Sequence, residues 1–175
     1  MLTVVIPTMA GDDERLAQTL AVLVRHAVSG AIVEVIVLDG ADDGEQRRVA
    51  EVAGCRYCRA EAAHLPDLLA QMRGTWVLVL EAGARPVGAW IDAVEDHINA
   101  ATRASGAARF RIAPDPAANW WRRLWGPRVP ARPFARGFLI SRAQASALSG
   151  DGRPLGALPR GLAVRTLPAA LSPRH

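Results

Sequence analysis

Residues 35 to 44 read Val-Ile-Val-Leu-Asp-Gly-Ala-Asp-Asp-Gly, an apolar run that leads directly into a turn with three carboxylates. The run predicts a buried strand that ends at Asp39, and ligands of open α/β sheets bind at the carboxyl ends of such strands. Gly40 lets the backbone come close to a bound molecule. Asp39 is therefore a candidate acceptor for hydrogen bonds from a ribose or a base, while Asp42 and Asp43 are candidates to cap the next helix and attract a cation. The alternative is an ordinary turn, because Asp-Gly pairs are common in loops.

The start of the chain predicts a second strand that lies beside this one. Residues 2 to 6 form a short β-rich run, and apolar residues then recur at helical spacing between positions 16 and 27 before the strand at 32 to 38. Strand, helix and strand in this order form a βαβ unit with a right-handed crossover. We therefore expect Thr8 and Asp39 to lie at the same edge of two parallel strands and to converge on one ligand.

The rest of the chain continues the alternation of strands and helices. Helices are predicted at 45–53, 65–73, 87–101 and 142–148, and strands near 55–58, 75–81, 108–112, 137–141 and 162–167. This pattern predicts an α/β fold, with a mainly parallel sheet covered by helices on both faces. A length of 175 residues, 50% of them hydrophobic, suits one domain that spans 1–175, and the last 25 residues are expected to pack loosely.

Three segments resemble the family-2 nucleotide-sugar glycosyltransferases, whose fold is called GT-A. Thr-Val-Val-Ile-Pro-Thr at 3–8 is similar to the first-strand motif of that family, and Val-Leu-Asp-Gly-Ala-Asp-Asp-Gly at 37–44 to the second. The segment 74–86 lies where the family has a strand that ends in an Asp-x-Asp element followed by Arg-Pro. Trp-Trp-Arg-Arg at 120–123 and Gly-Phe-Leu-Ile-Ser-Arg at 137–142 further resemble a small bacterial branch associated with arsenosugar-type transferases.

This resemblance covers about residues 2–142 and implies a single Rossmann-like GT-A domain. It implies transfer of a sugar, with inversion, from a nucleotide-sugar donor to an acceptor that the sequence does not name. Residues 1–102 are then the nucleotide-binding part, and residues 103–175 a basic part that faces the acceptor or a membrane. The implied nucleotide-binding residues are Pro7, Thr8, Asp39, Gly40, Asp42 and Asp43.

The metal-binding motif departs from the family pattern. The Asp-x-Asp element, which holds a divalent metal against the donor diphosphate in such enzymes, here reads Glu-Ala-Gly at 81–83. Glu81 is left as the candidate metal ligand, and the loss of the second carboxylate weakens the site for Mg²⁺ or Mn²⁺. Arg85 is a candidate to offset the charge of the diphosphate instead, with an ordinary surface ion pair as the alternative.

The catalytic base of the family is also missing from its expected place. The segment 153–160 contains no carboxylate, which leaves Asp151 as the nearest candidate base and an ordinary turn residue as its alternative. Two functions therefore stay open. One is a glycosyltransferase, and the other is a catalytically inactive relative that binds a nucleotide or serves as a scaffold.

Cys55 and Cys58 have the spacing of a redox or zinc motif, but we interpret them as structural. Side chains three apart on a strand point to opposite faces, and two cysteines do not complete a zinc site.

Charge divides the chain into an acidic and a basic part. Residues 1–102 carry 8 Arg and 15 acids, whereas residues 103–175 carry 13 Arg and 2 acids, and the chain has no Lys. In the basic part, a cluster of aromatic and Arg side chains suits an anionic membrane or a lipid-linked acceptor, with a core-packing helix as the alternative. Its residues are Trp120, Trp121, Arg122, Arg123 and Trp125.

The sequence shows no nucleic-acid-binding motif, so nucleic acid is an unfavoured partner. The sequence has no apolar run long enough to span a bilayer. We therefore expect a cytoplasmic protein, with peripheral contact at the inner face of the membrane as the alternative.

Overall fold

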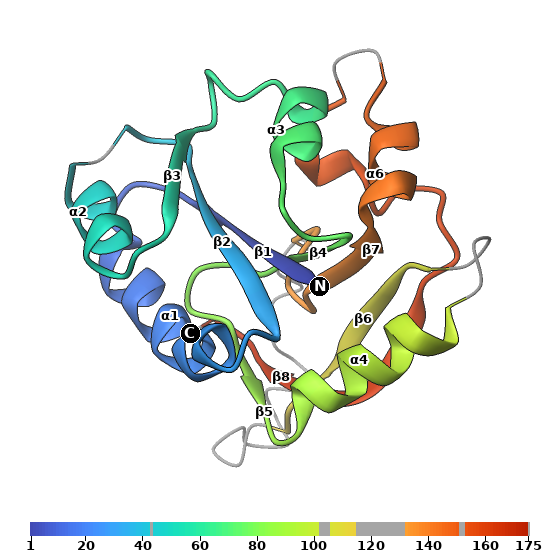
Figure 1. The fold of residues 1–175 in the computed structure, drawn as a ribbon. Coiled ribbons are helices and arrows are strands. Elements are labelled where there is room, and N and C mark those ends of the chain that lie inside the picture. Colours follow the sequence, from blue (N-terminus) through green and yellow to red (C-terminus); the bar gives the residue numbers. More distant parts are fainter. Residues whose placement is uncertain (43, 102–105, 115–131, 151–152, 175) are drawn as a thin grey trace, which may run out of the picture.

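The computed structural model describes residues 1–42, 44–101, 106–114, 132–150 and 153–174, which form one sheet with helices on both faces (Figure 1). The strands are β1 (Leu2–Thr8), β2 (Ile32–Asp39), β3 (Arg56–Arg59), β4 (Trp76–Val79), β5 (Arg85–Val87), β6 (Ala108–Ile112), β7 (Phe138–Ser141) and β8 (Arg165–Ser172). The helices are α1 (Asp13–Val28), α2 (Gly44–Val52), α3 (Leu65–Gln71), α4 (Trp90–Ala100) and α6 (Arg142–Leu148), with a short 3-10 helix at Leu155–Ala157.

The sheet has the strand order β3-β2-β1-β4-β7-β6-β8-β5. The first four strands are mutually parallel, as the βαβ pattern predicts, and β6 also runs parallel to β8. The remaining pairs, β4 with β7, β6 with β7 and β5 with β8, are antiparallel. Most pairs among the described strands are therefore parallel, and the predicted α/β class with a mainly parallel sheet is confirmed.

Alternate residues of the strands supply the two layers of the core. Leu2, Val4 and Ile6 of β1 face the layer that contains α1, α2 and α4, while Val5 faces the layer of α3 and α6. This follows from the period of two along a strand. A parallel sheet needs both of its faces covered, and these helices provide that cover.

Helix α1 lies on the sheet through its predicted apolar stripe. Leu16, Leu20 and Leu23 are all buried in the same core layer as the even-numbered residues of β1. The helix ends at Val28, and Gly30 follows in the left-handed region at φ 80°. Glycine adopts this conformation without steric cost, so it ends the helix and lets the chain return into β2.

Two parts of the C-terminal half differ from expectation. The sequence did not predict β5, and the helix expected to begin at residue 87 begins at Trp90. The expectation that the last 25 residues pack loosely was wrong, because β8 lies inside the sheet between β6 and β5. Burial alternates along β8, with Leu167, Ala169 and Leu171 in the core.

The strand predicted near 162–167 overlaps the start of β8, but its continuation past Pro168 was not predicted, since proline removes a donor from the hydrogen-bond ladder. The register between β6 and β8 shifts at this position: Arg109 pairs with Thr166, but Arg111 pairs with Ala170. The irregularity places Pro168 where the ladder is interrupted, and an interior strand therefore tolerates it.

The two cysteines are free and lie on opposite sides of the sheet, as expected for this spacing. Cys55 packs against the layer of α1 and α2, and Cys58 against the layer of α3. Burial raises the pKa of the Cys55 thiol to about 11, so it stays protonated at neutral pH.

Within the described ranges, every helix is too short or too polar to cross a membrane.

Gly74 makes the closest backbone approach in the parallel part of the sheet, and we expect Gly74→Ala to destabilise the protein by roughly 1 to 3 kcal/mol. A Cβ atom at this position would lie 2.5 Å from the backbone nitrogen of Thr3, which β1 holds in place. Gly44→Ala is the matched control, since a Cβ there meets nothing within 4 Å. Urea unfolding of both variants measures the difference, and equal stabilities would contradict this account of the packing.

Candidate functional site

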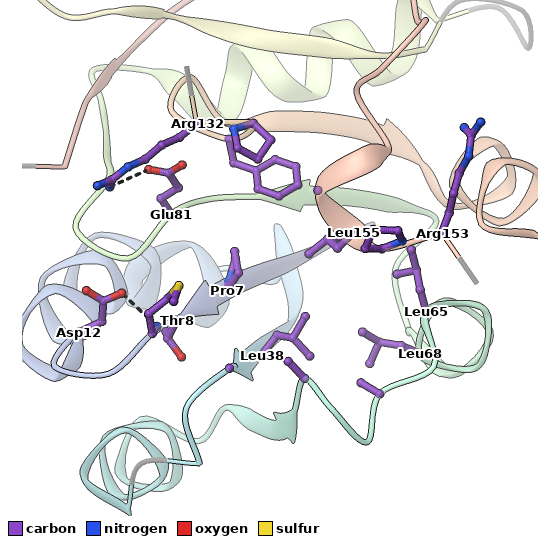
Figure 2. Close-up of a pocket in the computed structure, with 18 of the residues that line it drawn as sticks. Pro7, Thr8, Asp12, Leu38, Leu65, Leu68, Glu81, Arg132, Arg153 and Leu155 are labelled. Atoms are coloured by element: carbon purple, nitrogen blue, oxygen red, sulfur yellow. Dashed lines mark hydrogen bonds and ion pairs between the residues drawn. The ribbon is translucent and has the colours of Figure 1, made fainter. Parts of the chain in front are cut away.

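A cavity of about 820 Å³ opens at the carboxyl edge of the parallel strands (Figure 2). The register places Thr8 directly beside Asp39, and β4 ends two residues before Glu81 on the other side of β1. The cavity has a polar end with Asp12, Glu81 and Arg132, and an apolar side that leads away from it (Figure 2). The apolar side is formed by Leu38, Ala60, Ala63, Leu65, Leu68 and Leu155.

Thr8 lies in the wall of this cavity and is almost fully buried. Its Oγ1 has no hydrogen-bond partner among the described residues. A buried hydroxyl without a partner costs free energy, and such groups in native proteins call for an explanation. Pro7 and Met9 line the cavity on either side of it. A ligand with a polar group at this place would complete the hydrogen bonding of Thr8.

Asp39 supports the turn behind the cavity wall. Its Oδ1 accepts a hydrogen bond from the backbone N–H of Ala41 at 2.8 Å, and its Oδ2 accepts one from the Tyr57 hydroxyl at 2.7 Å. The N–H of Gly40 donates to the Thr8 carbonyl at 3.0 Å, which joins the turn to the end of β1. The structure therefore places Asp39 beside Thr8 as expected, but Gly40 and not Asp39 is among the residues that line the cavity.

Two other residues predicted to bind the nucleotide also belong to this turn. One lies away from the cavity, and the other is not among the residues that the structure describes. Asp42 is exposed, has a φ of 54° and pairs with Arg59 at 3.1 Å. Asp43 is not among the described residues, and α2 begins directly after it at Gly44. Asp151 and the cluster Trp120 to Trp125 are likewise outside the described ranges, so the predicted base and the predicted membrane contact stay predictions.

Glu81 stands at the polar end of the cavity, where its carboxylate pairs with Arg132 at 3.7 Å. Burial raises the pKa of this carboxyl, while Arg132, Arg174 and a hydrogen bond from the backbone of Phe134 act in the opposite direction. The side chain is 12% exposed. Cationic side chains therefore surround Glu81, and its role as a metal ligand stays a prediction.

Asp12 is the second carboxylate at this end and is 1% exposed. It accepts a hydrogen bond from the N–H of Met9 and forms ion pairs with Arg15 at 3.2 Å and with Arg174 at 2.9 Å. Arg174 follows β8, so the C-terminal end of the chain lies beside the start of α1 (Figure 1). A buried carboxylate needs such partners, because an unpaired charge in the interior is costly.

Sequence reasoning did not identify Arg132 and Arg174 as site residues. The excess of Arg after residue 102 was the one signal that pointed to this part of the chain. Arg85, which the sequence favoured for the diphosphate, lies instead in a smaller neighbouring recess that Arg15 and Gly83 also line. Its proposed contact with a diphosphate stays untested.

The described side chains do not fit a divalent cation well. In the part of the chain that the structure describes, no group of three His, Cys, Asp or Glu residues comes together. The two carboxylates at the polar end, Asp12 and Glu81, already have arginine partners. Mg²⁺ and Mn²⁺ need several oxygen ligands in near-octahedral geometry, which this donor set does not supply.

No family model and no curated protein sequence matches the chain, but its fold is similar to that of solved glycosyltransferases. Glucosyl-3-phosphoglycerate synthase from Mycobacterium tuberculosis, in complex with Mn²⁺, UDP and glucosyl-3-phosphoglycerate, is 16% identical with a TM-score of 0.60, covering 100% of this chain and 72% of that one. A mannosyltransferase from Pyrobaculum calidifontis, in complex with GDP-Man and Mn²⁺, is 16% identical with a TM-score of 0.59, covering 94% and 54%. TarS from S. aureus, in complex with UDP-GlcNAc, is 14% identical with a TM-score of 0.56, covering 84% and 47%. This chain spans about half the length of the latter two. At these identities the likeness establishes a GT-A-like α/β fold.

Tyr57 reports on the turn, because it is the single tyrosine of the chain. Burial, followed by its hydrogen bond to Asp39, raises the pKa of Tyr57 to about 12. The phenol donates only while protonated, so this bond stabilises the fold at neutral pH and is lost as the pH rises through about 12. We expect Asp39→Asn, which removes the negative charge, to lower the midpoint of tyrosine ionisation towards 10.0.

The measurement is an ultraviolet titration of tyrosinate, with circular dichroism at each pH to show that the protein remains folded. A folded wild-type protein whose tyrosine ionises at its ordinary pH would contradict the hydrogen bond.

Proposed function

We propose that this protein binds a nucleotide sugar in the cavity at the carboxyl edge of β1, β2 and β4 and transfers the sugar, with inversion, to an acceptor hydroxyl. The observation that carries the proposal is the position of the cavity in a GT-A-like fold, between Thr8 and Gly40 on one side and Glu81 on the other. Its volume of about 820 Å³ lies in the range of small-molecule sites. The structural neighbours hold UDP, UDP-GlcNAc or GDP-Man.

The two sides of the cavity suit the two parts of such a donor. We place the base and ribose against Pro7, Thr8 and the apolar side, where a flat base can stack on aliphatic side chains and Thr8 Oγ1 gains a partner. Asp39 contributes by fixing the turn through Ala41 and Tyr57, in addition to any direct contact with the nucleoside. The diphosphate then extends to the polar end.

In the transfer itself, an acceptor oxygen attacks the anomeric carbon while the bond from that carbon to the diphosphate oxygen breaks. The electron pair of the broken bond leaves with the nucleoside diphosphate, and a base takes the proton of the acceptor hydroxyl. Stabilising the charge on the leaving group is the main electrostatic task. Asp151 is our candidate for this base. Because the C-terminal part of the chain is basic, our candidate for the acceptor is a lipid-linked molecule.

The function is tested by titrating UDP, GDP and their sugars into the protein while following its melting temperature, with and without Mn²⁺. The nucleotide released on incubation with a donor is then measured. Binding with turnover supports the transferase. Binding without turnover supports the inactive nucleotide-binding relative, and the absence of binding to any nucleotide contradicts both.

Thr8→Val tests the nucleoside position without a change in shape. Because Thr8 Oγ1 is buried without a partner among the described residues, we expect the variant to be as stable as the wild type or about 1 kcal/mol more stable. We expect its nucleotide affinity to fall about tenfold, because the ligand loses one hydrogen bond in a desolvated site.

Thr3→Val is the matched control at the other end of the same strand. Thr3 Oγ1 accepts a hydrogen bond from the Gly74 N–H at 2.9 Å and donates one to Glu34, so this variant should lose roughly 1 to 3 kcal/mol of stability and keep its nucleotide affinity. Calorimetric titration and thermal unfolding measure both quantities. Unchanged affinity in Thr8→Val would argue against this placement of the nucleoside.

A further inference from the structure

Three arginines surround the two carboxylates at the polar end of the cavity, and one of them, Arg15, lines the neighbouring recess. The arginine cluster, as we call it, comprises Arg15, Arg132 and Arg174 around the carboxylates of Asp12 and Glu81. Arg132 and Arg174 both line the cavity, and both act on the Glu81 carboxyl. With three guanidinium groups around two carboxylates, the cluster keeps a net positive charge.

The carboxylates of this cluster are committed to partners inside the protein. Asp12 accepts from Met9, Arg15 and Arg174, and it is buried too deeply to rearrange without cost. A divalent cation bound to Glu81 would have to displace Arg132 and would then lie among fixed positive charges. The donor set therefore disfavours the cation that the family resemblance implies.

The arginines, in contrast, keep N–H donors for a ligand, although each terminal nitrogen of Arg174 already has one contact with Asp12. A guanidinium has five N–H donors in a rigid fork. In the described contacts Arg132 forms one ion pair, to Glu81, and its side chain is 49% exposed at the cavity. Arginine forks bind phosphate oxygens in a bidentate manner, and charge-assisted hydrogen bonds are the stronger kind.

We propose that Arg132 and Arg174 take the place of a divalent cation on the diphosphate of the donor, so that this protein binds nucleoside diphosphates without metal. The proposal rests on the proposed function and names the groups that hold its leaving group. Thr8 and the apolar side hold the nucleoside, and the arginine cluster holds the two phosphates.

The first experiment is calorimetric titration of UDP and GDP into the whole chain, in EDTA and in MnCl₂. We expect the Kd of the better ligand to agree within about threefold between the two conditions. We also expect Arg132→Gln and Arg174→Gln each to weaken this binding by about tenfold or more, and to change the affinity for uridine or guanosine by less than about twofold.

Glu81→Gln distinguishes binding of the diphosphate by a metal from binding by the arginines, because the two predict opposite changes in affinity. If a metal held by Glu81 binds the diphosphate, this variant loses nucleoside diphosphate binding. If the arginines bind it, affinity in EDTA stays equal or rises, because a negative charge next to the phosphates is removed. Arg73→Gln is the matched control, since Arg73 is exposed just before β4, at the opposite edge of the sheet, and should have no effect.

Circular dichroism shows that each variant is folded. Arg132→Gln and Glu81→Gln keep the test decisive if Arg174→Gln, which removes one of the two arginine partners of the buried Asp12, fails to fold. Binding of UDP or GDP that requires Mn²⁺ and is lost in Glu81→Gln would overturn the arginine proposal and leave the proposed function intact. Failure of nucleosides and nucleotides alike to bind, with or without Mn²⁺, would overturn both.

Discussion

Backbone hydrogen bonds between β1 and its two parallel neighbours determine where the groups of the cavity lie. The pairing aligns Thr8 with Asp39, and it brings the end of β4 to the same edge of the sheet. The turn after β2 is then joined to β1 by the bond from the Gly40 N–H to the Thr8 carbonyl. A shift of this register by one residue would turn Thr8 to the other face and empty the site of its polar group.

The buried carboxylate of Asp12 links this edge to the end of the chain. Its pairing with Arg174 requires that β8 enters the sheet between β6 and β5, because this brings the last residues next to the start of α1. A buried charge is tolerated only with such partners. The ion pair between Asp12 and Arg174 therefore holds the end of the chain against α1 and also places charged side chains at the cavity. If the proposed binding mode holds, stability and ligand binding would depend on the same few side chains at this end.

A shared fold does not by itself assign chemistry. Two of the neighbours with this fold hold a nucleotide or a nucleotide sugar together with Mn²⁺, whereas in this chain arginines surround the carboxylate that follows β4. In this chain Glu81 follows β4 at the carboxyl edge of the sheet, and the partners of its carboxylate are guanidinium groups. In the binding mode that we propose, these fixed positive side chains would stabilise the diphosphate leaving group in place of a divalent cation.

A feature could be predicted from the sequence when the residues that determine it lie close together along the chain. The strands at both ends of α1, the turn at 39–44 and the alignment of Thr8 with Asp39 follow from patterns within the first 44 residues, because hydrophobic period and crossover handedness are local constraints. The opposite faces of Cys55 and Cys58 follow from the same alternation. The partners of Asp12 and Glu81 were decided only in the tertiary structure, since Arg174 and Arg132 lie far along the chain from them and no local pattern specifies which guanidinium reaches a given carboxylate. The sequence predicted the start of β8, but not its continuation beyond Pro168, which an interior strand tolerates where the register with β6 shifts.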